Sequence, residues 1–271
     1  MNQDIRGRLT RDNIRIYSDA DFAGMHTAGA LAAQILDDVA ALVDVGQTTG
    51  AIDRFITDAV EAAGAVSATI GYKGYQHASC ISVNHVVCHG IPGDKKLKDG
   101  DILNIDVTVI VDGWFGDTSR MYVAGKLSRK TERLIQVTHD ALFKGIEAVR
   151  PGNTFGDIGY AIQSYVEGER MSVVRDFCGH GLGRVFHAPP NVLHFGREGT
   201  GPRLEEGMFF TIEPMVNLGR PETKVLADDW TAVTRDKSLS AQFEHSVGVT
   251  ADGVEIFTLS PSGRFHPTYE S

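Results

Sequence analysis

The chain of 271 residues carries a formal net charge of −9 at pH 7, and its 42% apolar and 23% charged residues are ordinary proportions for a globular protein. The acidic balance and the lack of a long Lys/Arg run argue against nucleic acid as the main partner. No apolar run reaches the roughly 18 residues of a membrane-spanning helix, and the N-terminus lacks the apolar core of a secretory signal. Three cysteines are too few for a disulfide framework and predict a reducing, cytoplasmic location.

Two helices are predicted near the N-terminus, after a polar and irregular arm over residues 1–17. Ser18 and Asp21 resemble a capping box at the start of a long helix over 18–43, in which apolar residues recur at helical spacing. A shorter helix is predicted over 48–64, because Thr stands at its start and Gly at its end. The chain therefore begins with an arm and a helical pair.

Strand-like runs rich in Val and Ile follow over 66–70 and 79–88, and the strongest run occupies 102–123. This last run is divided by Asp112-Gly113, a dipeptide that suits the two-residue type I′ turn of a β-hairpin. The sequence therefore predicts two antiparallel strands joined at this dipeptide.

Two carboxylates lie on the predicted hairpin. In its register Asp106 stands opposite Ser119, and Asp117 lies diagonally across on the same face, about 7–8 Å away. A carboxylate in a buried strand is costly unless it is paired or binds a metal, and two on one face repel, so a shared cation is one explanation. From the hairpin alone, two solvated Asp side chains on an exposed face are the simpler explanation.

The order of elements starts again in the second part of the chain. Helices are predicted over 128–149 and 154–167, followed by strands and loops. Segment 45–52, VGQTTGAI, matches segment 151–158, PGNTFGDI, at four of eight positions and at an offset of 106 residues. This internal repeat predicts a duplicated unit with a pseudo-twofold axis and one site where the halves meet.

Further carboxylates occupy corresponding places in the second part. The offset of the repeat carries Asp106 to the neighbourhood of Glu213, which interrupts the apolar strand pattern 208–216. The partner strand is predicted over 240–249, a segment that contains Glu244. The repeat therefore predicts a second pair of carboxylates near the first.

A histidine joins this set. His180 lies between glycines in segment 178–187, CGHGLGRVFH, where the backbone can approach a ligand closely. The candidate metal ligands are Asp106, Asp117, His180, Glu213 and Glu244. This oxygen-dominated set suits Mn²⁺, Fe²⁺ or Co²⁺, with Zn²⁺ as a further option. Four carboxylates exceed the charge of one divalent ion, so two ions about 3.5–4 Å apart balance them better.

Two more histidines stand at the edges of predicted strands. His89 follows an apolar strand, and His187 precedes Ala188-Pro189. Side chains at such edges can face a cleft, although a single histidine in such a place is more often structural. The pattern by itself leaves both interpretations open.

The chain closely resembles the bacterial type I methionine aminopeptidases over nearly its whole length. The resemblance is specific, because five ligand positions occur in order and with matching neighbours. The segments that carry it are 87–92, 103–119, 179–183, 211–214 and 242–245.

The resemblance implies an α+β pita-bread fold, which is a pseudo-twofold duplicated unit with a curved, mostly antiparallel sheet and two helix pairs on its outer face. It implies one metallopeptidase domain over 1–271, composed of the arm 1–17, a first half 18–125 and a second half 126–271.

The resemblance also implies an activity, the removal of N-terminal methionine from nascent proteins and peptides with small second residues. The five ligands would hold two divalent ions (Co²⁺, Mn²⁺ or Fe²⁺, with Zn²⁺ as an option). His89 would contact the scissile amide, His187 would steady the substrate carbonyl, and Glu213 would be both a metal ligand and a proton carrier. The implied methionine pocket consists of Tyr72, Tyr75, Cys80, Phe186 and Trp230, whose aromatic rings and thiol suit a thioether.

The implied partners are the N-termini of nascent polypeptides, and a place at the ribosome is compatible with that role. The resemblance implies a cytoplasmic monomer that requires neither nucleic acid for catalysis nor a membrane.

Four positions depart from the family pattern. Ala188 and Pro189 stand where the family often has two Glu, His85 where Glu is usual, and Thr69 where Cys is often found near the pocket. None of the four is a metal ligand, so the departures bear on the pocket and the rate.

Two alternative functions share this fold, and the first of them also shares the ligand set. One is an Xaa-Pro aminopeptidase or prolidase, and the other is a non-catalytic pita-bread module that binds a protein or peptide. The proline-specific enzymes usually carry a large extra N-terminal domain, whereas this chain starts almost at its first predicted helix. The non-catalytic modules typically lose ligands, whereas all five candidates are present here.

Overall fold

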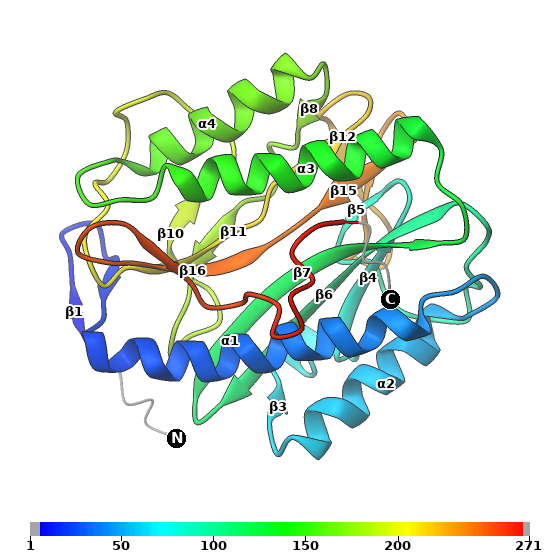
Figure 1. Ribbon diagram of the computed structural model, residues 1–271, viewed down its shortest axis with the longest axis horizontal. Coiled ribbons are helices and arrows are strands. Elements are labelled where there is room, and N and C mark those ends of the chain that lie inside the picture. Colours follow the sequence, from blue (N-terminus) through cyan, green and yellow to red (C-terminus); the bar gives the residue numbers. More distant parts are fainter. Residues whose placement is uncertain (1–5, 268–271) are drawn as a thin grey trace.

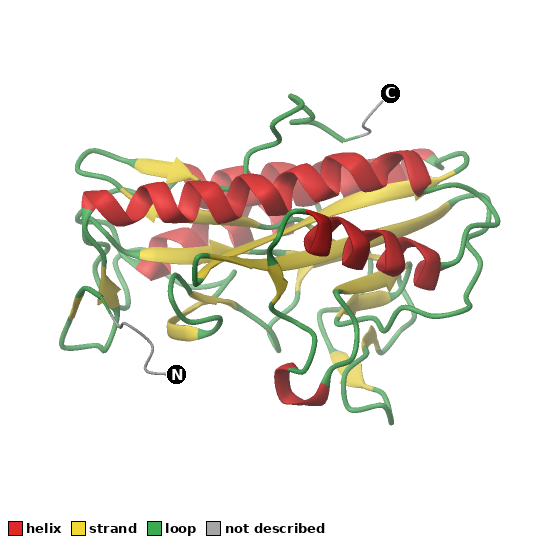
Figure 2. Cartoon of the chain, turned by 90° about the horizontal axis from the view of Figure 1, so that it is seen from below, coloured by secondary structure: helices red, strands yellow, loops and turns green. Residues whose placement is uncertain are grey.

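In residues 6–267, which the computed structural model describes, four α-helices cover one side of a layer of curved strands (Figure 1, Figure 2). The helices and 3-10 turns are α1 (Asp19–Val39), η1 (Ala40–Leu42), α2 (Thr49–Ala62), η2 (Tyr72–Gly74), α3 (Arg129–Glu147) and α4 (Phe155–Gly168). The pair α1 and α2 lies beside the pair α3 and α4 (Figure 1). None of these helices combines the length and the apolarity that a membrane crossing requires.

The strands of the described residues form five hydrogen-bonded groups, and their pairings are antiparallel. In chain order they are β1 (Arg8–Leu9), β2 (Arg15–Ile16), β3 (Val66–Ser67), β4 (Ser79–Val83), β5 (Val86–Cys88), β6 (Asp101–Val111), β7 (Trp114–Ala124), β8 (Ser172–Val173), β9 (Gly179–Gly181), β10 (Ala188–Val192), β11 (Phe209–Ile212), β12 (Met215–Asn217), β13 (Thr223–Val225), β14 (Ala232–Thr234), β15 (Ser240–Gln242), β16 (His245–Val249) and β17 (Val254–Ile256). The groups are β1-β2, β10-β9-β11-β16-β17, β15-β12-β8, β13-β14-β5, and β3-β6-β4 with β7 on β6. The predicted α+β class is therefore confirmed.

The longest strands, β6 and β7, form the predicted hairpin. Asp112 and Gly113 have φ angles of 50° and 79°, the positive values that a type I′ turn requires at both central positions. The register pairs Asp106 with Ser119 and sets Asp117 two positions away on the same face. Because Asp117 is only 3% exposed, the explanation of two solvated carboxylates is wrong.

A second antiparallel ribbon repeats this arrangement in the other half. Strand β11 pairs with β16 and β12 pairs with β15, and both pairings follow one continuous register. That register sets Glu213, between β11 and β12, opposite Glu244, between β15 and β16. Ser119 of β7 forms a bridge with Glu244, so the two ribbons meet beside their carboxylates, as the internal repeat predicts.

The helices begin at the capping residues that the sequence predicts. Ser18 and Asp21 form a capping box at α1, in which the Ser18 N–H donates to Asp21 Oδ2 over 2.9 Å. Thr154 and Asp157 form the same arrangement at α4, with a distance of 2.7 Å between Thr154 N and Asp157 Oδ2. Each box stabilises its helix by satisfying backbone donors at the N-terminus.

Three local predictions are wrong. Segment 66–70 gives only the two-residue strand β3, and segment 79–88 is divided into β4 and β5 by a turn in which Asn84 has a φ of 59°. Asn tolerates this left-handed conformation, which accounts for the break. The predicted irregular arm contains the hairpin β1–β2 over 8–16, and its residues 1–5 lie outside the described residues.

Separate apolar clusters lie beneath the two helix pairs. Buried side chains of α1 and α2 pack on β4, β6 and β7, whereas those of α3 and α4 pack on β11, β12, β15 and β16. Strand β7 approaches α1 very closely, because a Cβ at Gly116 would lie 2.2 Å from the carbonyl oxygen of Ala28. Only glycine fits there, and this close contact sets the position of the strand that carries Asp117.

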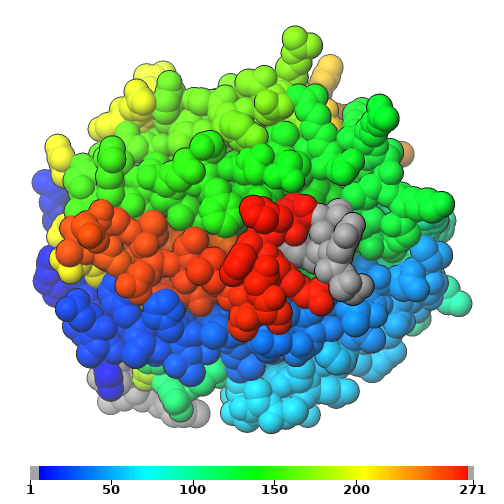
Figure 3. All heavy atoms as spheres, in the orientation of Figure 1, coloured from blue at the N-terminus to red at the C-terminus, as the bar shows by residue number. Residues whose placement is uncertain are grey.

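The C-terminal segment 258–267 crosses the seam between the helix pairs, where it lies between α1 and α3 (Figure 3). Asp37 of α1 ties this segment down, since its carboxylate accepts hydrogen bonds from Ser260 Oγ over 2.8 Å and from Ser262 N over 3.1 Å. The same carboxylate pairs with Arg120 of β7, and the Arg120 and Asp37 side chains are 5% and 2% exposed. Asp37 therefore links a helix, the hairpin and the C-terminal segment.

Asp37→Asn is expected to lower the free energy of unfolding at pH 7 by about 3 kcal/mol or more, because Arg120 would keep a buried charge without its partner. Burial alone raises the pKa of Asp37, but Arg120 and the hydrogen bonds outweigh it and hold the pKa below its ordinary value. The stabilisation by Asp37 is present above pH 3.9, which is about the pKa of an Asp in the unfolded chain. It is lost as the pH falls through the lower pKa that Asp37 has in the folded protein. Urea unfolding at several pH values measures both effects.

The matched control is Asp38→Asn, because Asp38 is the exposed neighbour of Asp37 on the same helix. The control should stay within about 0.5 kcal/mol of the unmodified protein. A loss below about 1 kcal/mol for Asp37→Asn at pH 7 would contradict the role given to the buried pair.

Candidate active site

A cavity of about 800 Å³ lies against the two ribbons, and the helices α1 to α4 contribute none of its lining residues. The site residues that the sequence predicts all line it: Tyr72, Tyr75, Cys80, His89, Asp106, Asp117, His180, Phe186, His187, Glu213, Trp230 and Glu244. The structure therefore brings together the candidate ligands, the two histidines and the pocket residues. They come from strands of both halves and from the loops between them.

Three candidate ligands form a tight group. One ligand atom each of Asp117, His180 and Glu244 lies within 4.8 Å of the other two, a separation that one ion can bridge. His180 Nε2 lies 3.5 Å from Asp117 Oδ2 and 3.8 Å from Glu213 Oε1. Asp106 faces the same cavity, and burial together with the charges of Asp117 and Glu213 raises its pKa well above the ordinary value.

Hydroxyl and amide side chains hold two of the carboxylates in place. Thr108 Oγ1 donates to Asp117 Oδ1 over 2.7 Å, and Thr211 Oγ1 donates to Glu213 Oε1 over 2.7 Å. Gln242 Nε2 lies 3.3 Å from Glu213 Oε2. Such partners orient metal-binding carboxylates.

The ring of His180 is oriented by the backbone. Its Nδ1 lies 3.2 Å from the carbonyl oxygen of Gly181, and its backbone N–H donates to Thr211 Oγ1 over 3.0 Å. A proton on Nδ1 leaves the lone pair of Nε2 directed at Asp117 and Glu213, which is the state that a metal-binding imidazole needs. Burial alone lowers the pKa of His180, but the two carboxylates outweigh it and raise the pKa.

Among the described residues, His180 is the basic side chain that pairs with these four carboxylates, and one imidazole cannot balance four negative charges. Within the described part of the chain, no Lys or Arg forms an ion pair with Asp106, Asp117, Glu213 or Glu244. Burial raises the pKa of Glu213 to about 7, and burial and the charge of Asp117 raise the pKa of Glu244 well above its ordinary value. This buried set of oxygen donors with one imidazole fits divalent cations, whose charge would remove the electrostatic cost.

The two further histidines lie within the aromatic part of the cavity. The ring centroid of His187 lies 4.1 Å from that of His180, and His187 stacks on Tyr72 at 5.1 Å. His89 meets Trp230 edge-on at 6.1 Å. Burial lowers the pKa of both rings, that of His187 to about 4, so both are neutral at pH 7 and can donate a hydrogen bond.

His89 has an unusual backbone conformation. Its φ of 55° lies in the left-handed region, which residues other than Gly seldom adopt. The next residue is held firmly, because Gly90 N donates to Ser82 Oγ over 3.1 Å and Gly90 O accepts from Tyr75 OH over 3.3 Å. A Cβ at Gly90 would lie 2.3 Å from Ile81 O, so this close approach requires glycine.

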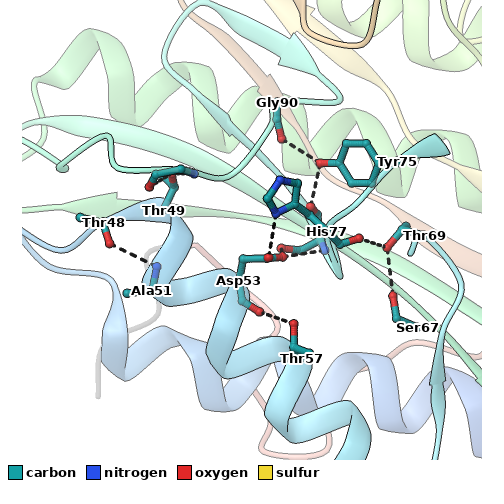
Figure 4. A network of polar contacts seen from close by, with 12 residues as sticks. Thr48, Thr49, Ala51, Asp53, Thr57, Ser67, Thr69, Tyr75, His77 and Gly90 are labelled. Carbon is teal, nitrogen blue, oxygen red and sulfur yellow. Dashed lines mark hydrogen bonds and ion pairs between the residues drawn. The ribbon is translucent and has the colours of Figure 1, made fainter. Parts of the chain in front are cut away.

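A polar network connects α2 to the strand that carries Cys80 (Figure 4). Asp53 of α2 accepts hydrogen bonds from Ser79 N over 3.0 Å and from Ser79 Oγ over 2.7 Å, and it pairs with His77 Nδ1 at 3.1 Å. Tyr75 OH donates to Ser79 O over 2.9 Å. The network therefore links the helix layer to a tyrosine of the predicted pocket.

The residues of the predicted methionine pocket gather at the cavity. Tyr75 lies against Trp230, and Tyr72 lies against Phe186, with ring centroids 4.9 Å apart in each pair. Cys80 is buried, and burial raises the pKa of its thiol, so the group stays neutral. Aromatic walls with a neutral thiol suit an apolar, polarisable side chain.

The sequence analysis did not identify several residues that position the candidate ligands. His194 is fully buried, and its Nε2 accepts a hydrogen bond from Glu213 N over 3.1 Å. Three further residues each stand two positions from a candidate ligand in the same extended segment: Thr108 from Asp106, Thr211 from Glu213 and Gln242 from Glu244. That period-2 spacing is a signal that could have found them, whereas His194 has no comparable local signal.

The departures from the family pattern fall in different places. Thr69, Ala188 and Pro189 line the cavity, whereas His85 does not. The first three can therefore affect substrate contacts directly, and His85 lies outside this group.

Comparison with known proteins identifies the family. The sequence profile of metallopeptidase family M24 matches residues 23–251. The chain belongs to metallopeptidase family M24. It is 57% identical to the methionine aminopeptidase of Rickettsia prowazekii (strain Madrid E), over 94% of this chain and 99% of that protein. It is 51% identical to the methionine aminopeptidase of Escherichia coli (strain K12), over 91% of this chain and 94% of that protein.

Solved structures confirm the fold of this M24 chain. The crystal structure of methionine aminopeptidase from Rickettsia prowazekii matches with a TM-score of 0.90, over 91% of this chain and 100% of that chain. The crystal structure of methionine aminopeptidase from Thermotoga maritima matches with a TM-score of 0.89 and 37% identity, over 90% of this chain and 99% of that chain. The prolidase from Pyrococcus horikoshii OT3 reaches a TM-score of 0.71 at 19% identity, which shows the shared fold alone. The pita-bread prediction is therefore confirmed.

Removal of divalent metal by a chelator is expected to make the stability of this M24 chain depend on pH. In the folded protein the pKa of Glu213 is about 7, whereas in the unfolded chain it is about 4.3. The folded state therefore holds this proton more tightly, and the resulting stability is fully present below about pH 4.3 and is lost as the pH rises through about 7. The melting temperature of the stripped protein should therefore fall between about pH 5 and about pH 8. Refilling at one hundred times the dissociation constant should add about 2.7 kcal/mol per ion, which calorimetry measures.

Stripped Glu213→Gln is the control, because it lacks the titrating carboxyl and should lose much of this slope. A stripped protein with the same melting temperature at both pH values would contradict the electrostatic account of the site.

Proposed function

We propose that this chain removes N-terminal methionine from peptides and nascent proteins by metal-dependent hydrolysis. The observation that carries the proposal is a single cavity that combines the five candidate metal ligands, three of them within 4.8 Å of one another, with an aromatic and thiol-lined pocket. The 57% identity with a methionine aminopeptidase over 94% of the chain supports the same reaction. The chain is thus an enzyme of the hydrolase class, and small second residues are preferred because the site must close around that position.

The proposed metal ligands are Asp106, Asp117, His180, Glu213 and Glu244. Their four carboxylates support two divalent ions, which would be Co²⁺, Mn²⁺ or Fe²⁺, with Zn²⁺ as an option. When bound, the ions would polarise the scissile carbonyl and supply a water of lowered pKa. The hydrogen bonds from Thr108 to Asp117 and from Thr211 to Glu213 support these roles, because they orient both carboxylates.

Three residues of the chain are proposed to act on the substrate during catalysis. His89 donates a hydrogen bond to the scissile amide, and His187 steadies the carbonyl oxygen on which negative charge develops. Glu213 carries a proton to the leaving nitrogen. Their places along one cavity, with neutral imidazoles at both histidines, support these roles.

The proposed site for the methionine side chain is formed by Tyr72, Tyr75, Cys80, Phe186 and Trp230. The edge and tilted contacts among these rings leave an apolar surface beside the two histidines. The thioether would gain contacts with polarisable rings and sulfur there.

We also propose the wider setting of this activity. The arm 1–17 and the halves 18–125 and 126–271 would form one metallopeptidase domain, and the protein would act as a cytoplasmic monomer. Its substrates would be nascent polypeptides, including those at the ribosome, and catalysis would need no nucleic acid. The free state of all three cysteines supports a reducing compartment.

The direct test measures methionine released from Met-Gly-Met and Met-Pro-Gly, beside cleavage of Ala-Pro-Gly. The protein is stripped with a chelator and refilled with Mn²⁺, Co²⁺, Fe²⁺ or Zn²⁺. Metal-dependent release of methionine from the first two peptides alone is expected. Preferred cleavage of Ala-Pro-Gly would instead indicate a proline-specific peptidase. No cleavage of any of the three peptides, with metal bound, would indicate a non-catalytic module.

His187→Ala is expected to retain its metal and to lower kcat by about 10²- to 10³-fold, because one donor to the developing oxyanion is removed. Metal analysis and steady-state kinetics on Met-Gly-Met measure both properties. His85→Ala is the matched control, since this histidine lies outside the cavity lining. A kcat within about threefold of the unmodified enzyme would rule out the proposed role of His187.

A further inference from the structure

Lys73 differs from every other charged side chain around the cavity. Among the described residues, it is the only Lys or Arg that lines the cavity. The acidic lining residues are Asp12, Asp106, Asp117, Asp176, Glu213 and Glu244. Apart from the proposed metal ions, this ammonium is therefore the positive charge that the described lining offers to an anion.

The η2 loop places this ammonium beside an aromatic ring that stacks on a proposed catalytic histidine. Lys73 Nζ lies 5.3 Å from the ring centroid of Tyr72, and that ring stacks on His187 at 5.1 Å.

The loop backbone is closed in a conformation that is uncommon for lysine. Lys73 has φ 47° and ψ 29°, between Gly71 with φ 85° and Gly74 with φ 89°. Gly71 N donates to Tyr75 O over 2.7 Å, and Tyr75 N donates to Tyr72 O over 2.9 Å. A residue other than Gly in the left-handed region costs free energy, and such positions concentrate at functional sites.

The exposure of Lys73 indicates which part of a substrate it would meet. The metal ligands and Cys80 are largely buried, whereas Lys73 is exposed at the cavity wall. In the proposed reaction the N-terminal methionine occupies the buried end, and the remainder of the peptide leaves toward solvent. The ammonium would therefore face the leaving side of the peptide.

We propose that Lys73 is a specificity residue that pairs with a carboxylate on the leaving side of the scissile bond. That carboxylate would be the C-terminus of a short peptide or an acidic side chain at the third position. This inference rests on the proposed function. Lys73 changes how tightly such substrates bind and leaves the chemical step to His89, His187 and Glu213.

Two pairs of peptides test the proposal and separate the sources of the carboxylate. Met-Gly-Met is compared with its C-terminal amide, and Met-Gly-Glu amide is compared with Met-Gly-Gln amide. For at least one pair, the enzyme should show a KM about 2- to 5-fold lower for the charged member, with nearly equal kcat, as for an exposed ion pair. The pair that responds identifies the carboxylate, and high salt should weaken the preference.

Substitutions assign the effect to this side chain. Lys73→Met should make the two KM values equal, and Lys73→Glu should reverse the preference. Lys126→Met is the matched control, because Lys126 is exposed and lies outside the cavity lining, and it should keep the preference.

Equal KM values within both pairs, or a preference that survives in Lys73→Met, would overturn the role of Lys73 while methionine release continues. Failure of every peptide to release methionine, with metal bound, would overturn the proposed function itself. The two failures are therefore distinguishable.

Discussion

The concentration of four carboxylates in one largely buried cavity is the constraint on which the site depends. Each of them is costly away from water, and their mutual repulsion adds to the burial that raises the pKa of Asp106 and Glu244. No Lys or Arg of the described chain pairs with them, and the single imidazole of His180 cannot balance four carboxylates. The divalent cations expected of an M24 metallopeptidase would offset this negative charge. The divalent-metal chemistry of the M24 family follows from the same charges that make a metal-free site unfavourable.

The two ribbons bring these carboxylates together from distant parts of the chain. Each ribbon carries its carboxylates on one face, and the ribbons touch at the bridge between Ser119 and Glu244. Asn104 strengthens this junction, because its Nδ2 donates to Ser119 Oγ over 3.0 Å and to Gln242 O over 2.8 Å. One buried amide therefore adds two hydrogen bonds between the ribbons, beside those from Thr118 Oγ1 to Glu244 O and from Ser246 Oγ to Asp117 O. The helix pairs stay on the other side of the strands and act as support for this junction (Figure 2).

What the sequence could predict depended on whether the signal was local. A turn dipeptide and period-2 alternation were sufficient to place Asp106 and Asp117 on one face, and the internal repeat led close to Glu213. Those rules do not reach His194, because its hydrogen bond to the Glu213 backbone spans 19 residues and depends on tertiary packing. The break at Asn84 was missed for the opposite reason, since a continuous apolar run conceals one residue in the left-handed region.

Two non-glycine residues at the cavity adopt positive φ, and their surroundings suggest different tasks. His89 is followed by Gly90, which is held through Ser82 and Tyr75, so its ring is fixed by a buried frame. Lys73 lies in an exposed loop closed mainly by its own backbone, so its ammonium keeps freedom to move. A group that acts on the scissile bond gains from rigid placement. An exposed charge contributes only weakly to affinity, which suits an enzyme that must accept the N-termini of many proteins and still discriminate slightly among them.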